Sequence, residues 1–269
     1  MPGPRRTAAL SRACHPGPAL AVTVLATAYA VSAGLGPSRV GLVAAAVLAG
    51  QLSIGWGNDL VDASRDQAVG RGDKPVATGD LPRSTARVAV AVASAATVVL
   101  SLACGVVAGL VHLGCVAAGW AYNLGVKATP LSGVPFAVAF GGLPVFVALA
   151  EPGGGPPPWW VVVAGALLGV GAHLVNVLPD LADDEATGVR GLAHRVGPRQ
   201  ASVLAVASLG AATGVIAVGA SAVPGVVLVL VLATVAVLAG LALVAGGRVP
   251  FRAAVGIALV DVVLLVVAR

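Results

Sequence analysis

Nine apolar segments follow one another along this chain, and most are long enough to cross a lipid bilayer. A membrane-spanning helix needs about 20 mainly apolar residues. Segments of this kind occupy residues 18–36, 40–57, 85–109, 110–124, 133–150, 158–178, 200–220, 223–245 and 249–268. Their Ala, Val, Leu and Gly content favours helices over the alternating strands, about ten residues long, of a membrane barrel. We therefore predict an all-α integral membrane protein, with nine transmembrane helices in a single domain over residues 1–269.

The charged residues support this class and indicate an orientation. Charged residues make up 10% of the chain, whereas a soluble domain carries about 25%. If the N-terminus lies inside the cell, all but two of the 16 Lys and Arg residues fall in inside segments, and only Arg39 and Arg269 lie outside. This bias follows the positive-inside rule, so the net charge of +5 does not indicate nucleic-acid binding. We expect a multi-pass protein of the plasma membrane with a cytoplasmic N-terminus, whose first helix is retained although it resembles a signal peptide.

Two short segments hold nine of the 11 acidic residues. They follow the second and sixth apolar segments, so we expect them in cytoplasmic loops, and they contain Asp59, Asp62, Asp66, Asp73 and Asp80, then Asp180, Asp183, Asp184 and Glu185. Residues spaced i, i+3 and i+7 share one face of a helix, as Asp59, Asp62 and Asp66 would. Asp180 and Asp184 are one helical turn apart in the same way.

Such carboxylate pairs suit Mg²⁺, which takes oxygen ligands, keeps several waters and needs only one or two carboxylates beside substrate phosphates. We predict that Mg²⁺ is bound by Asp59, Asp62, Asp66, Asp180, Asp183 and Asp184. Bound metal would neutralise a departing diphosphate, which makes Asp59, Asp62, Asp66, Asp180 and Asp184 the candidate catalytic residues. The alternatives are solvated acids that cap helices, and a Ca²⁺ site, although neither cluster has the EF-hand pattern.

Basic and polar residues near the two clusters are candidates for substrate binding. Arg and Lys side chains bind phosphate oxygens, but the same residues can serve only to orient the chain. Lys127 is the one cation of its loop and is either a substrate contact or a topological charge. His173 and Asn176 line a cavity or form hydrogen bonds inside the bundle. The intramembrane Asp261 is a candidate functional residue, but it is far from both clusters in the sequence, so we expect a structural hydrogen bond. The predicted substrate-binding set is Asn58, Arg65, Arg71, Lys74, Tyr122, Lys127, His173, Asn176 and Arg190.

The two acidic motifs resemble those of the UbiA superfamily of intramembrane prenyltransferases. The family's NDxxDxxxD motif is matched by NDLVDASRD at 58–66, and its DxxxD motif by DLADD at 180–184. Residues 74–79, KPVATG, are similar to the family's RPlxSG stretch, with Lys74 in place of Arg. The resemblance implies nine helices around a central cavity. It also implies Mg²⁺-dependent transfer of an isoprenyl group from its diphosphate to a hydrophobic, usually aromatic, acceptor in the bilayer, with no obligate protein partner.

Two other functions stay open at this point. A membrane terpene cyclase would capture the same cation with the substrate's own double bonds, but the ten aromatic side chains of this sequence offer few rings to stabilise it. An ion-coupled transporter would place its acids at mid-membrane in broken helices, whereas these acids follow the ends of apolar segments. Release of pyrophosphate separates enzyme from transporter, and product masses with and without an aromatic acceptor separate transferase from cyclase.

Overall fold

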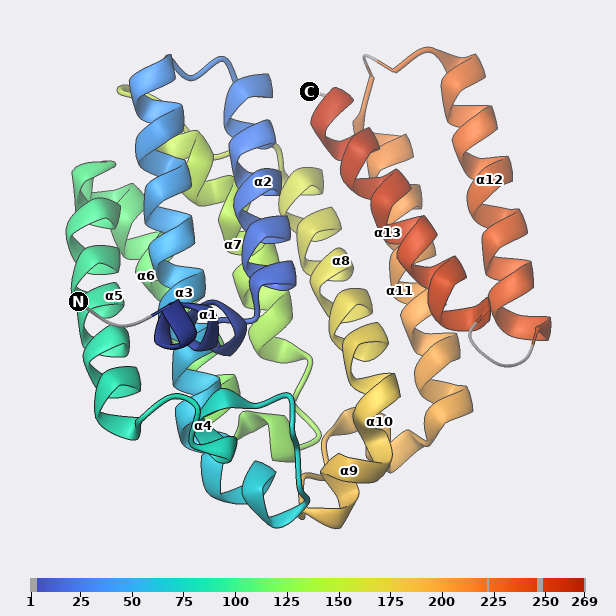
Figure 1. Cartoon of the computed structure of the whole chain (residues 1–269). Helices are drawn as coiled ribbons and strands as arrows, with labels where there is room; N and C mark the ends of the chain where they lie inside the picture. Colours follow the sequence, from blue (N-terminus) through green and yellow to red (C-terminus); the bar gives the residue numbers. More distant parts are fainter. Residues whose placement is uncertain (1–3, 222, 246–248, 269) are drawn as a thin grey trace. The chain divides into compact units, whose positions relative to one another are not determined.

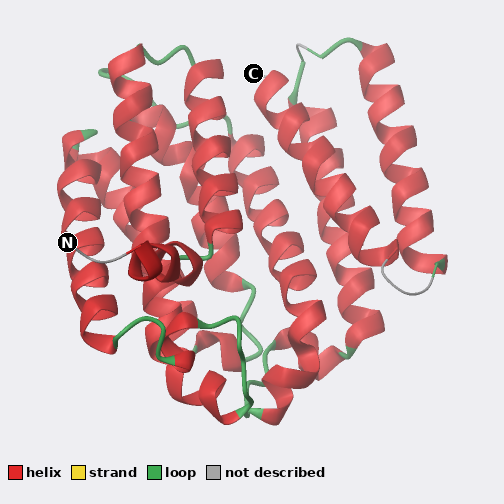
Figure 2. Ribbon diagram, in the orientation of Figure 1, coloured by secondary structure: helices red, strands yellow, loops and turns green. Residues whose placement is uncertain are grey.

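A computed structural model describes residues 4–221, 223–245 and 249–268, and every regular element in these ranges is a helix (Figures 1 and 2). Contacts divide the chain into two compact units. The first comprises Met1–Gly125 with Phe146–Gly154, and the second comprises Val126–Val145 with Gly155–Arg269. Helix α7, Val134–Leu149, contributes to both. The single-domain organisation stays a prediction.

The first unit is built around the long helix α3. Its neighbours α2, α5 and α6 pack along it, and the short helices α1 and α4 pack against α3 and against each other (Figure 1). The elements are α1 Pro4–Ala13, α2 Pro16–Ser32, α3 Pro37–Ala68, α4 Pro75–Thr78, α5 Arg83–Ala103 and α6 Val106–Leu124. Proline, which is favoured in the first helical turn, opens α2, α3 and α4.

The second unit centres on α8 and α11, which pack against each other. Helix α13 contacts both of them, and α12 packs on α11 and α13. Three short elements, η2, α9 and α10, connect α8 to α11. The bounds are η1 Val126–Ala128, α8 Trp159–Val177, η2 Leu178–Asp180, α9 Leu181–Ala186, α10 Leu192–Val196, α11 Pro198–Gly219, α12 Gly225–Val244 and α13 Val249–Val267.

Each of the nine predicted apolar segments contains a helix, but the number of spans is confirmed only in part. Seven helices within the described ranges are long and apolar enough to cross a membrane, and α2 becomes an eighth only if it is joined to α1 across a 62° bend. Helix α7 is apolar but has 16 residues, so its crossing stays a prediction. The boundary expected near residue 109 lies instead at Gly105, which has φ 117° between α5 and α6.

The placement of the first acidic motif in a loop was wrong. Helix α3 continues through the whole first motif to Ala68 and ends just before Gly70, which has φ 72°. The physical reason is that residues 58–68 contain no Gly or Pro to stop the helix, although their polarity ends the apolar segment. The second motif forms η2 and α9, so it too is helical.

Candidate functional site

The acids of the first motif are buried, in contrast to the solvated acids of the alternative interpretation. Asp59 is 1% exposed and Asp62 is 8% exposed, and both lie on the last turns of α3. Asp66 is half-buried on the same helix. The three residues follow the i, i+3, i+7 spacing on one continuous helix, as predicted. Burial of ionisable groups is costly unless they are paired or bind a cation. The buried acids of α3 therefore require hydrogen-bond partners, ion pairs or a bound cation.

Asp59 is held by the helix that the KPVATG segment forms. The backbone N–H of Val76 on α4 donates a hydrogen bond to Asp59 Oδ2 at 3.1 Å. Gly79, with φ 84°, ends that short helix. Asp59 Oδ1 has no hydrogen-bond partner and lies 3.7 Å from Lys74 Nζ. Buried Oδ2 of Asp66 also lacks a hydrogen-bond partner.

These two carboxylate oxygens, which accept no hydrogen bond, fit a hard divalent cation such as Mg²⁺, whose ligands in proteins are oxygens. Within the described ranges, no three His, Cys, Asp or Glu side chains come together as a complete metal cluster. Mg²⁺ in proteins takes one or two carboxylates and fills its remaining positions with water and substrate phosphate. The donor set of the first motif is therefore suited to Mg²⁺ together with a phosphorylated ligand.

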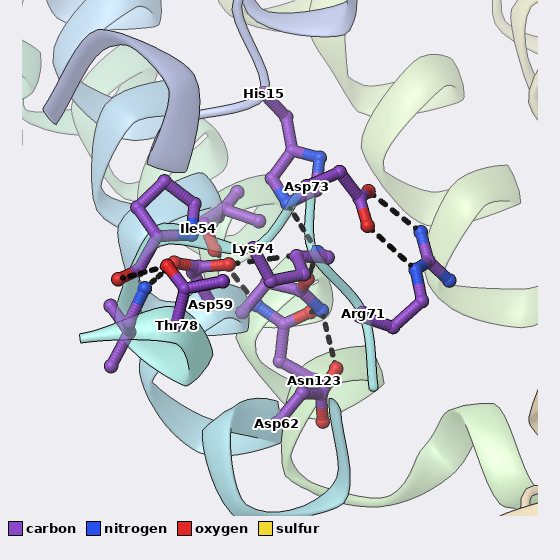
Figure 3. A network of polar contacts seen from close by, with 12 residues as sticks. His15, Ile54, Asp59, Asp62, Arg71, Asp73, Lys74, Thr78 and Asn123 are labelled. Atoms are coloured by element: carbon purple, nitrogen blue, oxygen red, sulfur yellow. Dashed lines mark hydrogen bonds and ion pairs between the residues drawn. The ribbon is translucent and has the colours of Figure 1, made fainter. Parts of the chain in front are cut away.

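A chain of side-chain amides connects the first motif to α6. Asn58 Nδ2 donates to Asp62 Oδ2 at 3.0 Å and to Asn123 Oδ1 at 3.1 Å. Asn123 Nδ2 in turn donates to the Ile54 carbonyl at 2.9 Å (Figure 3). The other oxygen of Asp62, Oδ1, pairs with Arg65 at 2.9 Å. Asn123 was not predicted from the sequence. The only feature that could have identified it is its polar side chain at the end of the apolar segment 110–124.

Lys74 lies buried in the same network. Its ammonium is 3.0 Å from His15 Nε2, 3.4 Å from Asn58 Oδ1 and 3.7 Å from Asp59 Oδ1 (Figure 3). The structure thus brings this predicted substrate residue to the first motif. His15 was not predicted, because it belongs to no motif and precedes Lys74 by 59 positions.

Arg71 is engaged by an exposed acid. Its guanidinium donates two hydrogen bonds of 2.9 Å to the two oxygens of Asp73. These bonds lower the pKa of Asp73 to about 2, so this carboxylate stays ionised at neutral pH. The structure therefore pairs Arg71 with Asp73, and its role as a phosphate contact stays a prediction.

Two glycines allow other segments to approach α3 closely beside the site. A β-carbon at Gly55 would overlap the backbone of Cys14, at the junction of α1 and α2. A β-carbon at Gly57 would overlap the ring of Trp120 on α6. Any larger residue at these positions would displace its neighbour, so the absence of a side chain sets how the N-terminal segment and α6 sit on α3.

The second motif lies in the second unit and has a histidine beside it. Asp180 ends η2, and Asp184 lies on α9 with Oδ2 3.9 Å from His194 Nε2. The His194 side chain is 4% exposed, and neither ring nitrogen has a hydrogen-bond partner. The side chain of Asp183, a predicted metal ligand, lies outside the described residues. Sequence reasoning did not select His194, which follows the motif in GVRGLAHRVG.

Ser132 connects three segments of the second unit. Its hydroxyl lies 3.0 Å from His173 Nε2 and accepts a 3.0 Å hydrogen bond from the backbone N–H of Leu192. His173 is 1% exposed and also contacts the ring of Phe136, with centroids 4.9 Å apart. His173 is therefore buried and in hydrogen-bond contact with Ser132, and its role as a substrate contact stays a prediction. Lys127 is buried on η1.

The remaining candidates occupy more exposed or separate positions. Asn176 is exposed on α8, and Tyr122 is half-buried on α6. Arg190 is exposed and pairs with Glu185 at 2.7 Å. For each of these the role in substrate binding stays a prediction. The structural hydrogen bond expected for Asp261 is confirmed, since its Oδ1 accepts from Thr213 Oγ1 at 2.6 Å inside the second unit.

Comparison with known proteins places this chain among intramembrane enzymes. A model of the UbiA prenyltransferase family matches residues 19–265. The fold is similar to that of a UbiA homolog from Archaeoglobus fulgidus bound to GPP and Mg²⁺, with a TM-score of 0.73, 16% identity, and coverage of 97% of this chain and 99% of that chain. An apo UbiA homolog from Aeropyrum pernix K1 has a TM-score of 0.73 and 20% identity, with coverage of 91% and 97%.

A structure of digeranylgeranylglyceryl phosphate synthase is also similar, with a TM-score of 0.71, 15% identity and coverage of 98% of each chain. No curated protein sequence matches. At these identities the solved structures show a common fold, and the family match covers almost the whole chain.

Proposed function

Because this chain belongs to the UbiA prenyltransferase family, we propose that it transfers an isoprenyl group from an isoprenyl diphosphate to a hydrophobic, aromatic acceptor inside the bilayer, with Mg²⁺ as its cofactor. The observation that carries this proposal is the pair of buried oxygens without a hydrogen-bond partner, Asp59 Oδ1 and Asp66 Oδ2, together with buried Lys74, which forms an ion pair with the first of them. A site with anionic oxygens for a metal and a cation for phosphate suits a metal-bound diphosphate. The Mg²⁺ complexes of GPP and DMAPP with the Archaeoglobus fulgidus homolog support the same cofactor and donor class.

In this proposal the acids of both motifs bind the metal ions that stabilise the diphosphate leaving group. Asp59, Asp62 and Asp66 of the first motif, and Asp180, Asp183 and Asp184 of the second, would hold Mg²⁺. When bound, the metal neutralises the negative charge that builds on the diphosphate. Lys74 donates hydrogen bonds to phosphate oxygens that the metal leaves open. The bond that breaks joins the allylic carbon to the diphosphate oxygen, and the bond that forms joins this carbon to the acceptor, which then loses a proton.

The chain's own residues organise the first half of the site before any ligand arrives. Val76 fixes one oxygen of Asp59, and Asn58 fixes one oxygen of Asp62. Groups that are oriented in advance cost less to reorganise when charge develops. Asn58 and Asn123 together connect this carboxylate geometry to the end of α6.

The proposed activity is tested by incubating the purified full-length protein, in detergent, with isoprenyl diphosphates of increasing length and Mg²⁺. We expect pyrophosphate release that depends on an added aromatic acceptor, and a product whose mass is the sum of prenyl group and acceptor less one proton. Release without an acceptor, with a cyclic hydrocarbon as product, would assign the chain to terpene cyclisation. No release from any isoprenyl diphosphate would remove the enzymatic function.

We further propose that both motifs face the cytoplasm and that the protein resides in the plasma membrane, because the positive-inside bias supports that orientation. The three native cysteines are buried, so introduced cysteines can report the topology. We expect Gly72→Cys and Ala186→Cys to react with a membrane-impermeant thiol reagent only from the cytoplasmic side, and Gly155→Cys only from the outside. A β-carbon meets nothing within 4 Å at Gly72 or Gly155, which makes these changes mild. Labelling of the first two from opposite sides would contradict a shared substrate.

A further inference from the structure

His15 is the only non-glycine residue with a positive φ among the described residues, with φ 54° and ψ 65°. It lies between α1 and α2 and directly before Pro16. The left-handed conformation is unfavourable for a residue with a β-carbon, and a following proline also disfavours helical backbone angles. A conformation of this kind persists only where surrounding contacts impose it, and such residues cluster at functional sites.

The backbone on the N-terminal side of His15 is anchored to α3 in two ways. The Trp56 indole N–H donates a 2.9 Å hydrogen bond to the Leu10 carbonyl. Cys14, the residue before His15, packs on Gly55, where a side chain would not fit. The apolar face of α1 also packs with α4, in a cluster that includes Ala9, Ala13, Val76 and Leu81. His15 is thus held at a defined place beside the helix that contacts Asp59.

The side chain of His15 makes a specific contact with Lys74. Its Nε2 lies 3.0 Å from the Lys74 ammonium (Figure 3). An ammonium group can only donate, so Nε2 accepts and the ring is neutral, with its proton on Nδ1. Burial, and next the nearby Lys74 charge, lower the pKa of His15 to about 4, which agrees with a neutral acceptor at physiological pH.

Lys74 therefore stands between two neutral acceptors, His15 Nε2 at 3.0 Å and the more distant Asn58 Oδ1 at 3.4 Å, and the carboxylate of Asp59. The ammonium donates a hydrogen bond to His15 Nε2, whereas its contact with Asp59 Oδ1 at 3.7 Å is an ion pair that is too long for a hydrogen bond. A carboxylate is the stronger partner for an ammonium group. Without the acceptor at His15, the ammonium would move onto Asp59 Oδ1, which is otherwise without a hydrogen bond. In that direct hydrogen bond, the Lys74 ammonium would be less available to a phosphate group and Asp59 Oδ1 less available to a metal ion.

We propose that His15 is a positioning residue, which holds the Lys74 ammonium away from Asp59 so that the lysine can bind a phosphate group and the carboxylate can bind a metal ion. This inference rests on the proposed function, because it assigns the N-terminal segment a role in preparing the site for diphosphate. His15 acts through Lys74 and does not itself contact the substrate.

The test compares two amide substitutions in the purified full-length protein. Gln in His15→Gln can place an acceptor near the position of Nε2. Asn in His15→Asn tolerates the left-handed backbone but is too short to reach Lys74. The probe is inorganic pyrophosphate with Mg²⁺, measured by titration calorimetry. Because a hydrogen bond to a charged group is lost, we expect His15→Asn to weaken binding by about tenfold or more, and His15→Gln to stay within about threefold of the unmodified protein.

Two further variants separate positioning from a general effect on α1. Arg12→Ala removes only the exposed ion pair with Asp80 and should leave pyrophosphate binding unchanged, since exposed pairs contribute little. If His15 acts through Lys74, adding His15→Asn to Lys74→Met should weaken binding no further than Lys74→Met alone. If His15 had a merely structural role, the losses of pyrophosphate affinity in His15→Asn and Lys74→Met would add in the double variant. Arg12→Ala would then lose as much affinity as His15→Asn.

The outcomes distinguish this inference from the proposed function. If the unmodified protein releases pyrophosphate from isoprenyl diphosphates but His15→Asn binds pyrophosphate as tightly as the unmodified protein, the positioning role is overturned and the function stands. Additive losses in the double variant overturn the positioning role in the same way. If the unmodified protein neither binds pyrophosphate with Mg²⁺ nor releases it from isoprenyl diphosphates, both the proposed function and the positioning role are contradicted.

Discussion

Replacement of Asp59 by asparagine is expected to lower kcat/KM for the isoprenyl diphosphate by at least about a thousandfold, which corresponds to about 4 kcal/mol of transition-state stabilisation. Asparagine has nearly the same shape, and its carbonyl can still accept the Val76 N–H bond that holds Asp59 Oδ2. What disappears is the negative charge at Oδ1, the buried oxygen that has no hydrogen-bond partner. Steady-state kinetics of the purified variant, together with its melting temperature, measure the effect.

Asp73→Asn is the matched control for this experiment. It removes one carboxylate charge from the same segment of chain, but Asp73 is exposed and paired with Arg71. We expect less than about a threefold change in kcat/KM for this control, because exposed ion pairs contribute little. Equal losses in both variants would show a general charge effect, and full activity in Asp59→Asn would remove this acid from metal-dependent chemistry.

Removal of divalent cations is expected to abolish turnover completely and reversibly. All-oxygen ligation by carboxylates favours Mg²⁺ and Mn²⁺ over metals that prefer sulfur or imidazole ligands. Activity should therefore disappear with excess EDTA, return with Mg²⁺ and return partly with Mn²⁺. Binding of pyrophosphate, measured by calorimetry, should be lost and restored in parallel, which provides a readout that is independent of turnover.

The control for chelation is the stability of the protein itself. Because the Val76 N–H and the Asn58 amide already hold Asp59 and Asp62 without a metal ion, we expect the melting temperature in EDTA without substrate to change by no more than a few degrees. Full activity after exhaustive chelation would contradict a metal-dependent diphosphate site. Unfolding in EDTA would instead assign the metal a structural role.

The membrane class, the approximate positions of the helices and the spacing of the acids could be predicted from the sequence, because each depends on residues close together along the chain. Nine apolar segments each contain a helix, and the i, i+3, i+7 pattern of Asp59, Asp62 and Asp66 lies on one helix, as expected. The loop placement of this motif was wrong because the prediction followed polarity, whereas α3 continues to Ala68 through residues that contain no Gly or Pro. The absence of Gly and Pro therefore indicated a continuing helix, which the hydropathy pattern did not.

The partners of the acids were decided only by the tertiary structure. Asn58 meets Asn123 across 65 positions, and Lys74 meets His15 across 59 positions. No motif joins these residues, since their contact depends on how α1 and α6 pack on α3, and that packing depends on the absence of side chains at Gly55 and Gly57. The same packing decides which carboxylate oxygens receive a hydrogen bond and which, like Asp59 Oδ1, do not. Composition and spacing thus identified the acids and the lysine of the site. Long-range packing added His15 and Asn123 and decided how each group is oriented, because these contacts join residues that are distant in the sequence.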